Sequence, residues 1–244
     1  MNTHRNITII ALFVAALVPV TASAQPPSPD HGARPDTLLI RNAMIVDGSG
    51  KPAYGPSTIV VKDDRIESIQ AANYEPSESD ADVREIDANG GYVLPGFVNM
   101  HAHIHGPWGL NVFPLDYIYK LWLACGITTV RDVGSVGGIT LTEREKSARG
   151  EIVAPHIFAY LWYPNGMIGE ELRTDAALDE AALRNAARAL HDRGADGLKL
   201  RHMDRESVRI VMDEANKLGL RTAHHIGVED MDALDAADFG TTTI

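Results

Sequence analysis

The sequence predicts an α/β protein in which a small β-domain precedes an incomplete (β/α)8 barrel. From residue 37 to about residue 94, short β-branched runs are broken by turn residues, which is typical of strands and hairpins. After Pro95-Gly96, strand-like runs alternate instead with helical ones, and this alternation indicates parallel βα units. A chain of 244 residues is long enough for one or two domains of these kinds.

The first residues predict export. Arg5 precedes an almost unbroken apolar run from Ile7 to Val20, and the small residues Ala22-Ser23-Ala24 follow it. This is the order of a secretory signal peptide over residues 1–24, with cleavage after the last of them. A retained membrane anchor is the alternative, but the run is shorter than the ~20 apolar residues of a span. We therefore expect an exported, periplasmic or secreted protein without a stable membrane anchor.

The β-domain is expected over residues 37–94, after a Pro-rich, flexible linker at residues 25–36. Within it, Thr58 to Val61 is β-branched and Asp63-Asp64 marks a tight turn before the apolar positions resume.

The barrel region, residues 95–244, predicts about five and a half of the eight βα units that close a barrel. The expected strands are residues 97–100, 127–130, 155–161, 197–200, 220–225 and a sixth from 241. The expected helices are residues 117–124, 179–193, 204–218 and 228–237, and the second and third of them carry an apolar stripe. Asp204 is expected to cap the third of these helices and Gly219 to end it.

Charge and cysteine content exclude some classes of function. The formal charge of −11 argues against nucleic acid as a partner, because a phosphate-binding surface would be basic. The sequence has a single cysteine, Cys125, so no internal disulfide can form.

His101 and His103 end the first expected barrel strand. Residues at i and i+2 share a face of a strand, and barrel enzymes build their sites at these strand ends. An H-x-H pair alone is a weak signal, but this pair follows a buried strand, so we expect both imidazoles to bind a metal ion. Gly106-Pro107 ends the strand soon after, so substrate contact or solvent exposure is expected for His105 rather than metal binding.

Three segments resemble the amidohydrolase superfamily. Residues 94–103, Leu-Pro-Gly-Phe-Val-Asn-Met-His-Ala-His, look like its opening motif. Residues 126–134 resemble its second strand and residues 194–200 its fourth, and the resemblance covers about residues 37–244. Within the superfamily the chain is most similar to the imidazolonepropionase-like and Xaa-Pro dipeptidase-like branch. The resemblance implies a (β/α)8 barrel, a small β-sandwich made partly from the N-terminal segment, and two divalent metal ions, zinc being the first choice.

The resemblance also implies that Lys199 is carbamylated and bridges the two metals. Lys199 lies between Leu198 and Leu200 in a short strand, so its side chain faces opposite to theirs, toward the barrel interior. The alternative is a surface lysine at a strand end. The family's metal-binding His after the fifth strand corresponds by count to His225, with His224 as the fallback. Only one of the two can point into the barrel, because adjacent strand residues face opposite ways.

The sequence departs from the family at Asn99 and in the residues that it lacks. Asn99 stands where an acidic residue is usual in the family. We expect this change to affect the fine adjustment of the metal site rather than the function itself. A further His after strand six and a catalytic Asp after strand eight are expected beyond Ile244, so we expect the 244-residue chain alone to be inactive and poorly stable.

Arg131-Asp132, at the end of the second strand, is expected to contact substrate or to form an ion pair at the barrel mouth.

The expected function is hydrolysis of a C–N bond, either an amide or a dipeptide bond such as that of Xaa-Pro dipeptides, by metal-activated hydroxide. The partner is then a small-molecule or dipeptide substrate, and a homo-oligomer is compatible with this function. A cyclic amide or imide hydrolase, a deaminase and an organophosphate hydrolase are alternatives within the enzyme class. A metal-binding module without catalysis is the alternative outside it.

Overall fold

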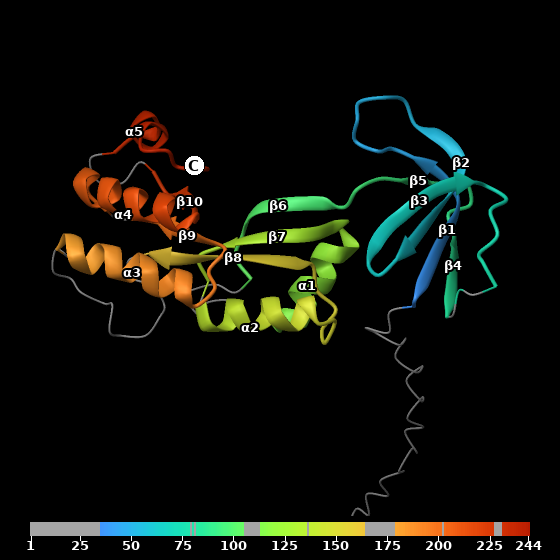
Figure 1. Cartoon of the computed structure of the whole chain (residues 1–244), viewed down its shortest axis with the longest axis horizontal. Coiled ribbons are helices and arrows are strands. Elements are labelled where there is room, and N and C mark those ends of the chain that lie inside the picture. The colour runs from blue at the N-terminus through green and yellow to red at the C-terminus, as the bar shows by residue number, and fades with distance from the viewer. Residues whose placement is uncertain are drawn as a thin grey trace, which may run out of the picture. The chain divides into compact units, whose positions relative to one another are not determined.

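The computed structural model describes residues 35–78, 80, 82–104, 113–135, 137–163, 179–201, 203–226 and 231–244. The expected signal peptide, most of the expected linker and His105 lie outside these ranges. No helix among the described residues is long and apolar enough to cross a membrane. The described residues form two sheets (Figure 1).

The N-terminal sheet has five strands. They are β1 (Thr37–Ile45), β2 (Tyr54–Lys62), β3 (Arg65–Ala71), β4 (Val83–Asp87) and β5 (Tyr92–Val93). The order is β3-β2-β1-β4, with β5 pairing with β1. Asp63 and Asp64 both have positive φ, 48° and 61°, which suits the tight turn predicted between β2 and β3. The small β-domain is therefore present as a sheet, while a second, sandwiched layer stays a prediction.

The barrel sheet consists of five parallel strands in the order β10-β9-β8-β7-β6. They are β6 (Phe97–Ala102), β7 (Ile127–Val133), β8 (His156–Tyr163), β9 (Gly197–Leu200) and β10 (Arg221–His224). The helices are α1 (Leu115–Ala124), α2 (Gly137–Ala148), α3 (Glu180–Asp192), α4 (Arg205–Leu218) and α5 (Ala233–Asp238). Thr243 forms a parallel bridge with Ala223, where the sixth strand was expected to begin. The predicted partial barrel is confirmed.

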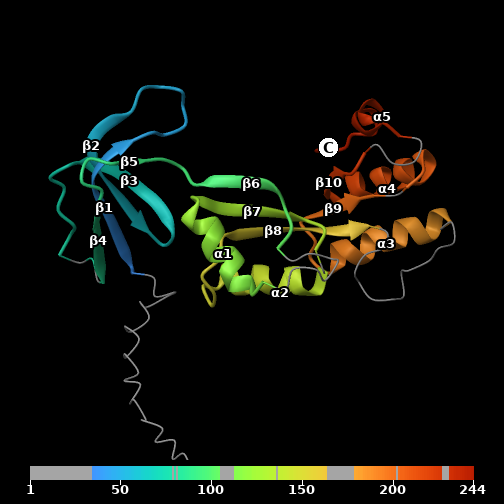
Figure 2. The same cartoon turned by 180° about the vertical axis from the view of Figure 1, so that it is seen from behind.

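The helices cover one face of the barrel sheet, with α1, α2 and α3 along the same side (Figures 1 and 2). The largest apolar cluster lies there and combines residues of α3 and α4, such as Leu190 and Val211, with Leu198 and Leu200 of β9. Asp204 caps α4 by accepting the N–H of Ser207, as predicted. The helix-covered face is thus the packed outer face of the barrel wall.

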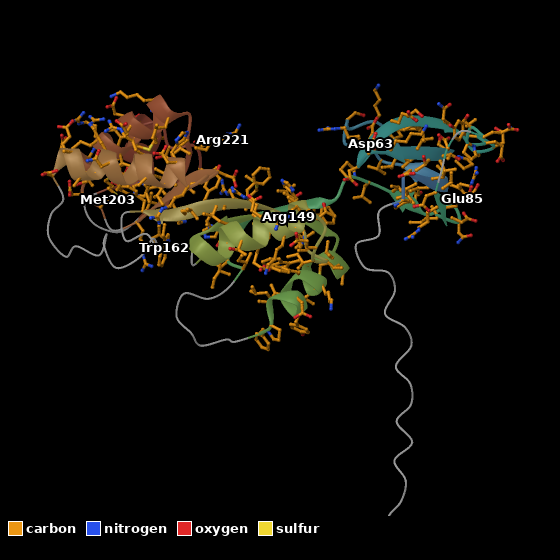
Figure 3. The ribbon with its side chains drawn as sticks, turned by 60° about the horizontal axis from the view of Figure 1, so that its bottom comes forward. Asp63, Glu85, Arg149, Trp162, Met203 and Arg221 are labelled. Atoms are coloured by element: carbon orange, nitrogen blue, oxygen red, sulfur yellow. The ribbon has the colours of Figure 1, made fainter. Side chains whose placement is uncertain are left out.

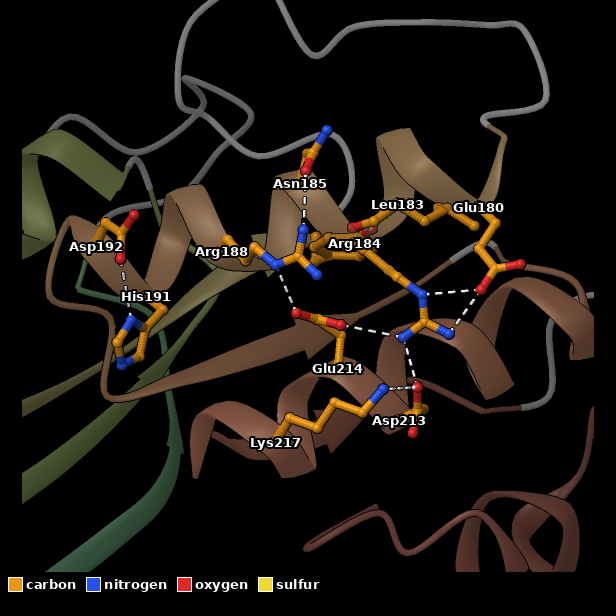
Figure 4. Close-up of polar contacts among 11 residues, drawn as sticks. Glu180, Leu183, Arg184, Asn185, Arg188, His191, Asp192, Asp213, Glu214 and Lys217 are labelled. Atoms are coloured by element: carbon orange, nitrogen blue, oxygen red, sulfur yellow. Dashed lines mark hydrogen bonds and ion pairs between the residues drawn. The ribbon is translucent and has the colours of Figure 1, made fainter.

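A buried carboxylate joins α3 to α4. The Glu214 side chain, 5% exposed, accepts hydrogen bonds from Arg184 at 3.0 Å and from Arg188 at 2.7 Å (Figure 4). Arg184 also binds Glu180 at 2.7 Å and Asp213 at 2.5 Å. Because α3 and α4 share an apolar cluster with Leu198 and Leu200 of β9, the network supports the outer side of the strand that carries Lys199.

Helix α2 was not predicted from the sequence. Its residues begin with two glycines, and apolar and polar side chains alternate without a clear stripe. Its place is fixed by tertiary contacts with β8 instead.

We expect Gly197→Ala to destabilise the protein. A Cβ at Gly197 would lie 2.7 Å from the carbonyl oxygen of Arg221 and 2.7 Å from the ring of Tyr160, so the backbone of β10 would have to move. Overpacking of this kind typically costs about 1–3 kcal/mol. The matched control is Gly138→Ala in α2, where no atom lies within 4 Å of the added Cβ. Urea unfolding of both variants measures the difference, and equal midpoints would contradict the expectation.

Candidate functional site

The two histidines of the opening motif lie together at the carboxyl end of β6. His101 belongs to the strand and His103 follows it directly. Their ring centroids are 5.6 Å apart, with the ring planes at 63°. Both side chains are exposed, whereas Ala102 between them and Ile104 after them are buried. The i, i+2 alternation therefore places both imidazoles on the same face, opposite the helices.

Lys199 lies on the same inner face of the barrel sheet. It is only 4% exposed, while its neighbours Leu198 and Leu200 belong to the outer cluster with α3 and α4. Trp162, labelled in Figure 3 near the carboxyl end of β8, is its partner in the parallel register. The predicted inward orientation of the lysine agrees with this packing.

The charge of Lys199 acts on both histidines of the opening motif. Burial lowers the pKa of His101, and the positive charges of Lys199, His103, Arg131 and His225 lower that pKa further. Burial also lowers the pKa of His103, as does the charge of Lys199, although a hydrogen bond to the backbone of Gly134 works in the opposite direction. The lowered pKa values favour neutral imidazoles, the form in which histidine binds a metal.

The strand register separates His224 from His225. Ala223 pairs with Lys199, so these two residues share a face of the sheet. His225 is two residues beyond Ala223, and its N–H continues the ladder by donating to the carbonyl of Leu200 at 2.9 Å. His224 alternates with them and is 3% exposed, and its Nδ1 atom has no hydrogen-bond partner. The register favours His225 as the residue that faces Lys199.

The candidate ligands His101, His103, Lys199 and His225 make an incomplete set of conventional metal ligands. In the described part of the chain, no three His, Cys, Asp or Glu side chains converge as they would around a metal ion. The candidate centre therefore depends on Lys199 as a donor in addition to the three histidines. A lysine can supply an oxygen ligand only after its neutral amine has taken up carbon dioxide.

The surroundings of Lys199 favour that neutral amine. Burial lowers the pKa of Lys199 to about 8, and the charges of Arg131 and Arg201 act in the same direction. A larger fraction of the amines is therefore neutral near pH 7 than for a solvated lysine.

The pH at which Lys199 becomes reactive is a testable consequence. Only the neutral amine is acetylated, so trace labelling of the metal-free protein with acetic anhydride should reach half its maximal rate near pH 8. Mass spectrometry of the Lys199 peptide measures that rate, with a simple alkylamine in the same reaction as reference. Stability should also rise with pH between about 8 and 10.5, because the unfolded chain holds this proton more tightly. Half-maximal labelling near pH 10 would contradict the expected environment.

Arg131 and Asp132, near the end of β7, point to opposite faces of the barrel sheet. Arg131 faces inward and is 7% exposed, and its guanidinium carbon lies 4.9 Å from the centroid of the Tyr160 ring. Asp132 is fully buried on the helix-covered side, where it accepts hydrogen bonds from Ser135 and Thr140, both at 2.7 Å. Burial raises the pKa of Asp132 to about 6 despite these hydrogen bonds.

This geometry revises the expectation for Asp132. Substrate contact, or an ion pair at the barrel mouth, was predicted for Arg131-Asp132 from its place at a strand end, but adjacent residues of a strand cannot both face the barrel interior. The carboxylate lies away from the face of His101 and His103, so direct contact with a substrate held there does not follow from the structure. The sequence signal that identifies the inward residue is the alternation itself, which selects Arg131.

Comparisons with known proteins agree with the motifs. No family model matches the chain. A deacetylase of Agrobacterium fabrum is 34% identical over 103 residues, covering 41% of this chain and 23% of the relative. A dihydroorotase of Bacillus pumilus is 28% identical over 151 residues, covering 59% of this chain and 33% of the relative. The chain thus matches only a third or less of the length of these curated relatives.

Among solved structures, the chain resembles a Xaa-Pro dipeptidase with methionine bound in its active site. The TM-score is 0.63 at 19% sequence identity, over 85% of this chain and 66% of that one. At this identity the likeness shows a shared fold.

Proposed function

We propose that this chain, which has the fold and the opening motif of the amidohydrolase superfamily, acts as part of a metal-dependent hydrolase of C–N bonds. One observation carries the proposal: His101, His103 and Lys199 share the inner face of the barrel sheet, and Lys199 is close enough for its charge to lower the pKa of both histidines. Two exposed imidazoles and a buried lysine have no evident structural purpose on that face.

The residues present would supply part of the ligand set for two divalent metal ions. His101, His103 and His225 would supply imidazole nitrogens, and a carbamylated Lys199 would supply the bridging oxygens. Imidazole and carboxylate-like oxygen ligands suit zinc well. When bound, such ions lower the pKa of a coordinated water to near neutrality and polarise a substrate carbonyl.

The chain's own residues prepare this site in three ways. The lowered pKa values of His101 and His103 keep both imidazoles unprotonated near neutral pH. The carbonyl of Gly134 accepts a hydrogen bond from the His103 ring, which fixes the orientation of that ring. The burial of Lys199 favours the amine that can react with carbon dioxide.

We propose amides and dipeptides, including Xaa-Pro dipeptides, as the substrate class. The fold likeness to a Xaa-Pro dipeptidase supports the dipeptide choice. A cyclic amide is the second candidate, favoured by sequence similarity to a dihydroorotase over 151 residues.

The experiment is a hydrolysis screen of the full-length protein after removal of its metals and reconstitution with zinc. The panel contains Xaa-Pro and other dipeptides, N-acetylated amino acids and cyclic amides, and a His101→Asn variant is the control. We expect zinc-dependent hydrolysis of at least one class, abolished in the variant. Tight zinc binding with no hydrolysis of any class would favour a metal-binding module, and the absence of zinc binding would refute the proposal.

A further inference from the structure

The strand that carries the two histidines is irregular where it approaches them. In the pairing of β6 with β7, Asn99 pairs with Val130 and Ala102 pairs with Asp132. Two residues of β6, Met100 and His101, therefore stand opposite a single residue of β7. A bulge of this kind leaves backbone groups outside the regular ladder, and those groups need other partners.

Arg131 supplies one of these partners from the inner face. Its Nε donates to the carbonyl of Met100 at 2.7 Å, directly before His101. The guanidinium is itself held, because Nη1 donates to Thr243 Oγ1 at 2.9 Å and the group stacks on the ring of Tyr160. A nearly buried side chain with three fixed contacts has little freedom to shift.

Asp132 supplies another partner from the outer face. Its carboxylate accepts the backbone N–H of Ile104, directly after His103. Ser135 and Thr140 donate to the same carboxylate at 2.7 Å each, so the group is anchored to the start of α2 and the turn before it. The carboxylate is fully buried, which makes the loss of any of these bonds unfavourable.

Two consecutive residues of β7 thus hold the backbone on both sides of the histidine pair. Within the bulge, the Asn99 carboxamide oxygen accepts the N–H of His101 at 3.1 Å and holds the segment from its own strand. Metal ligands must be kept within about 0.5 Å of their productive positions, and residues around the ligands provide that precision.

We propose that Arg131 and Asp132 are positioning residues that set the placement of His101 and His103 for metal binding. The inference rests on the proposed metal-dependent function, since it assigns these residues a role toward the same site. Neither side chain is required to touch substrate or metal. Their effect is on the affinity and geometry of the metal site.

The test measures zinc affinity of the full-length protein by competition with a chromophoric chelator. Asp132→Asn and Arg131→Met should each weaken zinc binding by about 10- to 100-fold, the usual effect of replacing residues that hold metal ligands. The visible absorption of the cobalt-substituted protein should change as well, because the two imidazoles move.

The matched control is Asp196→Asn. The Asp196 carboxylate also accepts a backbone N–H, that of Ala159 at 2.7 Å, and an arginine, Arg144 at 2.8 Å. It stands immediately before β9, at the opposite end of the sheet from the histidines. We expect Asp196→Asn to lower the unfolding midpoint while zinc affinity and the cobalt spectrum stay unchanged.

The outcomes separate this inference from the proposed function. A wild-type protein that binds no zinc refutes the function itself. Tight wild-type binding that persists unchanged in Asp132→Asn and Arg131→Met overturns the positioning role alone. If either variant fails to fold, Thr140→Val, which removes one bond to the Asp132 carboxylate, decides the matter: weaker zinc binding supports the role, and unchanged binding overturns it.

Discussion

Replacing Lys199 by alanine is expected to lower zinc-dependent hydrolysis by the full-length protein more than about 100-fold, because replacing residues behind the ligands already costs about 10- to 100-fold. The variant loses the only side chain in the candidate set that can bridge two ions through oxygen. Since Lys199 is 4% exposed, its removal also leaves a cavity rather than a solvated gap. Steady-state kinetics with the best substrate of the screen measure the loss.

The cavity provides an internal control. A short carboxylate such as propionate can enter the space and supply oxygen ligands, so it should restore part of the activity of Lys199→Ala. The matched surface variant is Lys217→Ala, whose side chain is 60% exposed and pairs with Asp213 on α4. It should retain full activity. Near-wild-type activity in Lys199→Ala would rule out the bridging role and leave a mononuclear site.

The second large effect is expected at His225. His225→Asn should weaken zinc binding by more than about 100-fold, since it removes a proposed ligand rather than a residue that holds one. His224→Asn should lower stability instead, because the ring is buried on the outer face beside the register partner Leu200. Chelator competition gives the zinc affinity of each variant, and thermal unfolding of the metal-free proteins gives the stability.

Comparing the adjacent residues His224 and His225 tests the predicted strand register directly. Both histidines come from one strand end, and the charge of Lys199 lowers the pKa of His224 as it lowers that of His101. Only the alternation of the strand distinguishes them. If His224→Asn lost zinc binding and His225→Asn kept it, the register of β10 would not predict the ligand, and the fallback from the sequence would be the correct choice.

Much of the barrel could be predicted because its signals are local. Parallel strands such as Gly197–Leu200 are short apolar runs, and helices such as α4 carry both a capping Asp and a terminal Gly. Helix α2 was not predicted, because its sequence has no clear apolar stripe and its position depends on contacts with β8. Tertiary packing overrides weak local propensity there.

The candidate site was predictable in its residue types but not in its supports. The H-x-H spacing and the apolar neighbours of Lys199 are visible in the sequence. The bulge in β6 is not, because the pairing of Asn99 with Val130 and of Ala102 with Asp132 appears only when two strands are aligned. The separate roles of Arg131 and Asp132 depend on that bulge and on residues as distant as Thr243.

The convergence of His101, His103, Lys199 and His225 around divalent metal ions is tested most directly by metal stoichiometry. Full-length wild-type protein and the double variant His101→Asn/His103→Asn are reconstituted with zinc, dialysed, and analysed for zinc per chain by mass spectrometry. The wild type should retain about two zinc ions per chain, as expected of a bridged pair. The double variant should retain less than one while keeping its circular dichroism spectrum. A double variant that keeps the wild-type zinc content would show that the metal lies elsewhere.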